Sequence, residues 1–188
     1  NQGLKKYGGD LAIGAFGIVN RLVFIVVMIV MGLNQGMQPI AGYNFGAKLY
    51  GRVNKVLRLT IIYATAVTTF GFLVGMLVPD LVVGIFTSDA ELTELSVTGL
   101  RITVMFFPII GFQMVTSNFF QSIGMAGKAI FLSLTRQMLI LLPCLLVLPQ
   151  FFGVAGVWYS MPVSDLLASL IALVMLVCQF RKFRTSPL

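Results

Sequence analysis

The chain has 188 residues, of which 58% are hydrophobic and only 10% are charged. Soluble domains carry about 25% charged residues, and disordered chains combine low hydrophobicity with high charge, so both classes are excluded. The net charge of +7 comes from basic residues scattered between apolar runs, so we expect no nucleic-acid partner.

Five apolar stretches follow one another along the chain, and each can hold the roughly 20 residues that a helix needs to cross a bilayer. They cover about residues 11–45, 59–78, 95–120, 129–149 and 154–180. No stretch alternates between apolar and polar residues with a period of two, as the strands of a membrane barrel would. The sequence therefore predicts an all-α, polytopic membrane helical bundle of about five transmembrane helices, with the lipid bilayer as its surroundings.

The first stretch contains one cation and a cluster of amides. Arg21 is expected near mid-bilayer, where a charge is costly and needs a partner. Asn34, Gln35 and Gln38 then interrupt the apolar run. Pro39 removes a backbone donor, so we expect irregular backbone at this point. Gln35 and Gln38 are candidates to line a substrate cavity, and a packed seam between helices is the open alternative.

Glycines spaced four residues apart recur in the first two stretches, and such pairs let two membrane helices approach closely. The pairs are Gly32–Gly36, Gly42–Gly46 and Gly71–Gly75. We expect all three to serve helix packing.

Charged residues between the stretches set the topology. With five spans, one side of the membrane receives these basic residues and no acid: Lys48, Arg52, Lys55, Arg58, Lys128, Arg181, Lys182 and Arg184. The positive-inside rule places that side in the cytoplasm, so we expect a multi-pass protein of the cell (plasma or inner) membrane with its amino end outside and its carboxyl end inside. The odd number of spans and the first residue, Asn1, lead us to expect that a preceding helix is missing.

The third stretch carries a polar stripe. Gln113, Ser117 and Gln121 are spaced by four residues and share one helix face, with Asn118 beside it. Gln113 and Asn118 are therefore further candidates for the substrate cavity, although a dry seam between helices would produce the same pattern.

The fourth and fifth stretches each carry one charge at mid-bilayer depth. At about 1.5 Å per residue, Arg136 and Asp165 fall at nearly one level on helices that a very short turn connects. Arg21 falls at a similar depth. We therefore predict that Asp165, Arg136 and Arg21 form an intramembrane charge element, either a structural clamp between helices or a site of proton or cation coupling.

Several kinds of chemistry have no sequence basis. The chain has no histidine, and its two cysteines, Cys144 and Cys178, lie within apolar runs. No nucleotide-binding loop, nucleophile with a base or metal-ligand spacing is found. We expect no enzymatic activity, no catalytic residue, no bound metal and no cofactor.

Longer motifs resemble the multidrug and toxic compound extrusion (MATE) family. The segment Gly32–Ala47, which reads GLNQGMQPIAGYNFGA, resembles the end of the second helix in the carboxyl-terminal lobe of that family. Pro108 with Gln113 and Asn118–Gln121 fits the tenth helix of the family. Arg136-Gln137 with Pro143 and Pro149 resembles the eleventh helix, and Gly153–Trp158, running on to Asp165, resembles the twelfth.

The resemblance implies two six-helix lobes around a central cavity, exporting organic, often cationic, compounds in exchange for Na⁺ or H⁺. Residues 1–188 would then be an incomplete carboxyl-terminal lobe whose partners are the missing amino-terminal lobe, the missing first helix of this lobe and small organic substrates. Some members carry acidic cation-site residues in the seventh and tenth helices. The seventh helix would be missing from this chain and the third stretch holds no acid, so coupling acids would lie in the missing lobe, or Asp165 would have to serve.

Two alternatives stay open. A lipid-linked or polysaccharide flippase of related architecture would need a more cationic cavity, for which Arg21, Arg101 and Arg136 are available. A non-transporting membrane assembly subunit would have polar spans satisfied by packing and no wet cavity.

Overall fold

A computed structural model describes residues 2–185, with side chains described for residues 10–153 and 155–181. All the regular structure in this range is helical, as the sequence predicts. The helices are α1 (Gln2–Gly46), α2 (Tyr50–Leu77), α3 (Pro79–Gly84), α4 (Ala90–Val104), α5 (Phe107–Ser122), α6 (Ala126–Leu134), the π-helix η1 (Thr135–Leu141), α7 (Leu142–Phe152) and α8 (Val154–Thr185).

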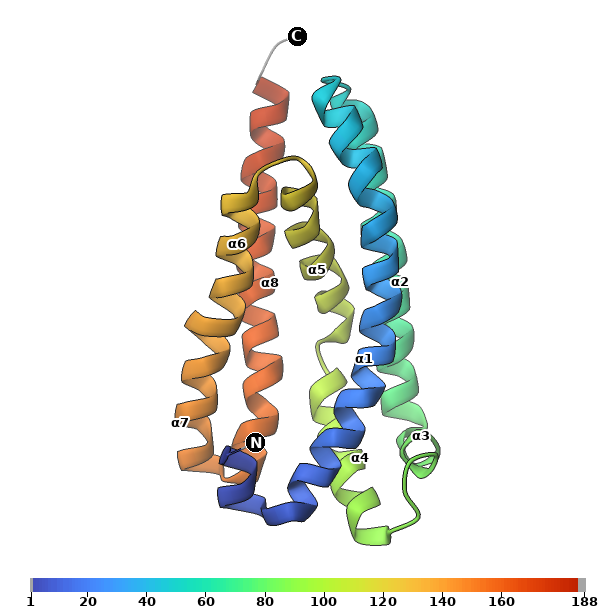
Figure 1. Cartoon of the computed structure of the whole chain (residues 1–188), viewed down its shortest axis with the longest axis vertical. Coiled ribbons are helices and arrows are strands. Elements are labelled where there is room, and N and C mark those ends of the chain that lie inside the picture. Colours follow the sequence, from blue (N-terminus) through green and yellow to red (C-terminus); the bar gives the residue numbers. More distant parts are fainter. Residues whose placement is uncertain (1, 186–188) are drawn as a thin grey trace.

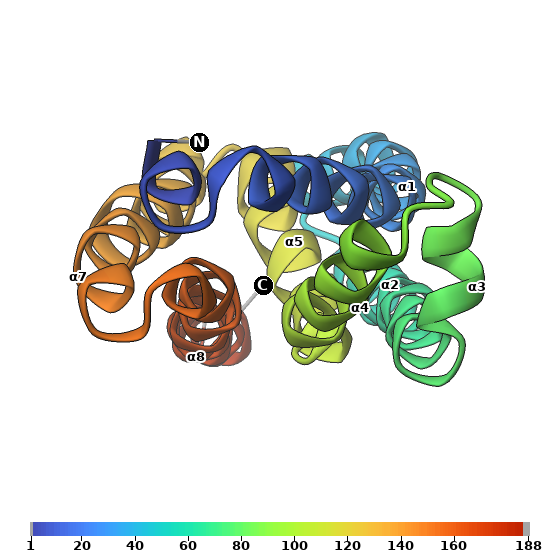
Figure 2. The same ribbon diagram turned by 90° about the horizontal axis from the view of Figure 1, so that it is seen from below.

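The long helices stand side by side along one axis (Figure 1), and the end-on view shows α1 lying along one side of the others (Figure 2). Four helical segments of the described chain are long and apolar enough to cross a membrane: residues 10–46, 50–77, 126–152 and 155–181. Helices α4 and α5 form a fifth span if the bent pair is counted as one. The chain is therefore built as a multi-pass membrane bundle.

Two prolines act differently on their helices. The α4–α5 pair bends by 54°, because Pro108 at the start of α5 cannot donate to the carbonyl of Val104 and its ring crowds that group. The irregular backbone expected at Pro39 is not found, and that expectation was wrong. Helix α1 runs through Pro39 to Gly46, with the proline on an exposed face of the helix.

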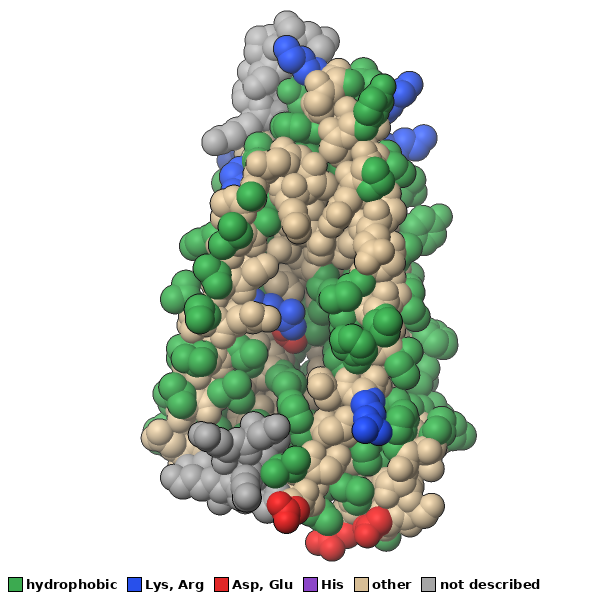
Figure 3. Space-filling view, viewed as in Figure 1, with side chains coloured by type: hydrophobic (Ala, Val, Ile, Leu, Met, Phe, Trp, Pro, Cys, Tyr) green, Lys and Arg blue, Asp and Glu red, His purple; other side chains and the backbone are tan. Residues whose placement is uncertain are grey.

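The connections divide between the two ends of the bundle. The α1–α2 turn, the α5–α6 turn and the end of α8 lie at one end, and the α2–α4 and α7–α8 connections lie at the other (Figure 1). Lys and Arg side chains gather at the first end and Asp and Glu side chains at the second (Figure 3). The molecule therefore carries the charge asymmetry that the sequence pattern predicts.

Close helix contacts explain some of the predicted glycines. A Cβ on Gly71 would lie 2.9 Å from Val26 on α1, and one on Gly42 would lie 2.9 Å from the Ser122 carbonyl oxygen. Gly32 and Gly36 have no atom of another helix within 4 Å of a built Cβ in the described chain. The pair lies on an exposed face of α1, so it packs against no helix of the described chain, and its packing role remains a prediction.

Candidate functional site

An ion pair between two helices lies at the centre of the candidate site. The Arg136 guanidinium donates through Nε to Asp165 Oδ1 at 2.8 Å, and its Nη2 lies 2.6 Å from the same oxygen. The Asp165 side chain is only 6% exposed, whereas that of Arg136 is 33% exposed. A buried carboxylate requires such a partner, since its desolvation is otherwise uncompensated. This is the one ion pair found between two described side chains.

The π-helix η1 brings Arg136 to its partner. The Leu142 amide donates to the carbonyl of Gln137, five residues earlier, in the wider pattern of a π-helix. Pro143 follows at once and has no amide to donate, so an ordinary α-helical ladder would be broken here in any case. Short π-helical segments are rare in proteins, and those that occur are often found at functional sites. This one carries Arg136, the cation of the pair.

The pair lies in a groove of about 280 Å³ bounded mainly by α1, α5, η1 and α8, with one residue each from α2 and α4. Figure 3 shows one basic and one acidic side chain together in a hollow halfway along this face. The groove walls are mainly phenylalanine, methionine and valine, with a few small polar groups. The lining includes Phe16, Asn20, Met31, Phe107, Met114 and Met161.

Sequence reasoning missed part of this lining. Asn20, Thr68 and Thr103 all contribute to the groove and were not singled out. Asn20 is an uncharged polar residue directly before Arg21 in an apolar run, and that pattern could have identified it. The hydroxyls of the two threonines donate to carbonyls one turn back in their own helices. A threonine can do this at any helix position, so the sequence does not show whether it lines a groove or packs against a neighbouring helix.

Arg21 lies outside the ion pair. Its residue is exposed on α1, and no ion pair joins it to Asp165 among the described residues. The charge element thus consists of two residues in this structure, and a role for Arg21 in it remains a prediction. The depth estimate could place Arg21 at the right level, but it could not tell which face of α1 carries it.

The four amides that were predicted to line a cavity are found in different surroundings, and none of them lines the Arg136–Asp165 groove. Gln38 donates to the Asn118 side-chain oxygen at 3.3 Å, and Asn118 donates to the Met114 carbonyl at 2.9 Å. Gln113 is 4% exposed, with its Oε1 buried and without a partner among the described residues. Gln35 is exposed on α1. Their role in a cavity remains a prediction.

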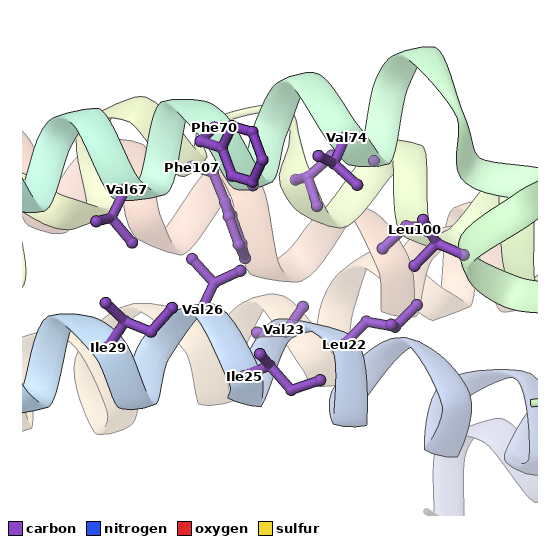
Figure 4. Close-up of a pocket in the computed structure, with 14 residues that line it drawn as sticks. Leu22, Val23, Ile25, Val26, Ile29, Val67, Phe70, Val74, Leu100 and Phe107 are labelled. Atoms are coloured by element: carbon purple, nitrogen blue, oxygen red, sulfur yellow. The ribbon is translucent and has the colours of Figure 1, made fainter. Parts of the chain in front are cut away.

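A second hollow, of about 230 Å³, lies between α1, α2 and the bent α4–α5 pair. Figure 4 shows Val26 of α1 and Phe107 of α5 directed into it, and Phe70 of α2 is also part of the lining. Its described lining is apolar throughout. Ligand sites normally add a few polar groups that fix orientation, so this hollow is a weaker candidate than the groove around the ion pair.

Comparison with known proteins finds a matching family model, similar curated proteins and similar solved structures. The family model MatE matches residues 4–146. The chain is 28% identical over 173 residues to the multidrug export protein MepA of Staphylococcus aureus (strain MSSA476), and the match covers 92% of this chain and 38% of MepA. The chain therefore spans well under half the length of that curated relative.

Solved structures of MATE transporters are also similar to this chain. The structure of the MATE multidrug transporter DinF-BH matches with a TM-score of 0.84 and 37% identity, covering 97% of this chain and 41% of that one. An outward-facing multidrug resistance MATE family transporter of the MOP superfamily matches with a TM-score of 0.90 over 98% of this chain and 42% of that one. Its identity of 18% supports the shared fold alone.

Proposed function

Because the chain belongs to the MatE family, we propose that it forms one lobe of a secondary active multidrug exporter. The family resemblance predicted from the sequence is confirmed by the match over residues 4–146. The exporter would move organic, often cationic, compounds across the bilayer and would catalyse no covalent reaction. A second lobe, outside these residues, would supply the other wall of the substrate cavity.

One observation carries the proposal: a buried, ion-paired carboxylate at mid-helix in a groove lined by aromatic and thioether side chains. Methionine and phenylalanine offer adaptable apolar surfaces that accept ligands of different shapes. Ionisable residues within membrane spans are rare, and they commonly mark a substrate pathway or an ion-coupling site. The lobe would rock against its partner around this midplane site to give alternating access.

Na⁺ or H⁺ is the proposed coupling ion, and no cofactor is required. Asp165 is the carboxylate placed deepest within the spans of the sequence. A coupling ion at Asp165 would have to compete with the Arg136 guanidinium for Oδ1. The second carboxylate oxygen, Oδ2, takes part in neither contact with Arg136, which supports a site that an ion can approach.

The proposed topology places the basic end of the bundle in the cytoplasm, with the amino end outside and the carboxyl end inside. Lys48, Arg52, Lys55 and Arg58 at that end support it through the positive-inside rule. Asp80, Asp89 and the two glutamates of α4 lie at the opposite end.

A flippase for anionic lipid-linked substrates is not favoured. Such a site would need several available cations, but the described groove contains one guanidinium and Asp165 already engages it. The groove also argues against a purely structural assembly subunit, whose polar groups would be sealed by packing.

Transport in reconstituted vesicles tests the proposal. The natural protein that contains this chain is incorporated into proteoliposomes, and ethidium movement is followed under separate Na⁺ and H⁺ gradients. We expect one gradient to drive ethidium movement and the 188-residue chain alone to show none, since half of the cavity wall is absent. Folded, reconstituted protein that moves no ethidium under either gradient would contradict the proposal.

A further inference from the structure

A groove at the basic end of the bundle has no role in the proposed transport. Helices α2 and α8 both pack against α5. The groove lies between the start of α2 and the end of α8, and its volume is about 620 Å³. This is more than twice the volume of the groove around the ion pair. It is lined by Tyr50, Asn54, Leu57, Arg58, Ile61, Ile62, Val177, Phe180 and Arg181.

The lining residues lie on one face of each helix. On α2 they recur at intervals of three and four residues from Tyr50 to Ile62, and on α8 Val177 and Arg181 are four residues apart. At 1.5 Å per residue, the α2 wall extends about 18 Å from the end of the helix toward the membrane centre. The groove is therefore long and parallel to the helices, and its lining includes exposed side chains on both of them: Asn54, Arg58, Ile62, Val177 and Arg181.

Charge is distributed unevenly along this groove. Arg58 and Arg181 provide two guanidinium groups, and Asn54 adds an amide. The deeper walls are apolar, with Ile61 and Ile62 on α2 and Val177 on α8. A guanidinium fork matches a phosphate group, and aliphatic walls match an acyl chain.

Arg58 has no acidic side chain on the walls of the groove. All six acidic residues of the chain are Asp10, Asp80, Asp89, Glu91, Glu94 and Asp165, and none lies in α2 or beyond Asp165 in α8. Arg58 is exposed and forms no ion pair with another described residue. It lies about 12 Å along α2 from the start of the helix, directly before the predicted span 59–78, which is the level of the lipid head groups.

We propose that this groove binds an anionic phospholipid from the leaflet at the basic end. Its phosphate lies between Arg58 and Arg181, and one acyl chain extends along Ile61, Ile62 and Val177. Basic pockets between membrane helices at the cytoplasmic side bind anionic head groups in this manner. Figure 3 shows the gathering of Lys and Arg side chains at this end that would attract such lipids. The proposal does not depend on transport.

Binding is measured on the natural protein in neutral detergent, by native mass spectrometry with added lipids of identical acyl chains. Phosphatidylglycerol should bind more tightly than phosphatidylcholine. Arg58→Gln should weaken phosphatidylglycerol binding about fivefold, the factor expected for one basic residue near an anionic surface. The matched control is Arg52→Gln, which removes the same charge from the same helix outside the groove and should leave binding unchanged.

A second variant keeps every charge. Val177→Trp fills the apolar part of the groove and should weaken lipid binding while circular dichroism and elution volume stay unchanged. Soluble glycerol 3-phosphate should fail to displace the lipid. Equal binding of both lipids, an unaltered affinity in Arg58→Gln or Val177→Trp, an equal loss in Arg52→Gln, or displacement by glycerol 3-phosphate would overturn the proposal.

Discussion

Removing either partner of the Arg136–Asp165 pair should destabilise the bundle, but by unequal amounts. Arg136→Met leaves the Asp165 carboxylate, whose side chain is 6% exposed, without its cation. Breaking a buried pair in this way costs about 3–5 kcal/mol, and the partial exposure of Arg136 favours the lower end, about 3 kcal/mol. Asp165→Asn leaves a guanidinium that is 33% exposed and can turn toward the groove, while the new amide oxygen still accepts a hydrogen bond. We expect that variant to cost about 1 kcal/mol.

The assay is a double-mutant cycle. The free energy of unfolding is measured by titrating the protein with sodium dodecyl sulfate in mixed micelles and following helicity by circular dichroism. The double variant Arg136→Met/Asp165→Asn should be about 1–2 kcal/mol more stable than Arg136→Met alone, because the uncompensated charge is gone. Additive losses, or a larger loss in Asp165→Asn than in Arg136→Met, would refute this reasoning.

Two further predictions concern packing and exposure. Gly99→Ala places a Cβ 2.5 Å from the Trp158 ring and should cost about 1–3 kcal/mol of unfolding free energy, and Trp158→Leu should recover part of that loss; a stable Gly99→Ala protein would contradict the close contact. In a background without the native cysteines, a water-soluble maleimide should label Gln35→Cys rapidly and Met37→Cys, a position 2% exposed, only slowly; a slow reaction at both positions would place Gln35 against lipid or packed protein.

Hydropathy predicted the fold well because membrane helices must satisfy their own backbone hydrogen bonds and must be apolar over a fixed length. The predicted all-α membrane bundle is therefore confirmed, and the described chain has five candidate spans when the bent α4–α5 pair counts as one. Local breaks in the helical backbone were harder to predict from the sequence. Pro39 leaves α1 continuous, whereas Pro108 accompanies a break, and membrane helices tolerate proline in both ways. The π-helix before Pro143 had no sequence pattern of its own.

The candidate site was predictable where the depth of two residues in the membrane is enough to bring them into contact. Arg136 and Asp165 lie on consecutive spans at one level, and they pair. Depth alone does not give the rotation about the helix axis, so it could not show that Arg21 would be exposed on α1 and outside the ion pair. The same limit applies to the amides. Gln38 meets Asn118 across a helix interface, but the facing side chains could be known only after the helices were placed.

The central claim is that the Arg136–Asp165 groove belongs to the transport machinery of a multidrug exporter. Gradient-driven ethidium movement by proteoliposomes containing the natural protein, compared with its Asp165→Asn variant, tests this most directly. We expect the variant to be folded and inserted to the same extent and to move ethidium at least about tenfold more slowly, the factor that corresponds to about 1.4 kcal/mol. An Asp165→Asn protein that moves ethidium at the unaltered rate would contradict the claim.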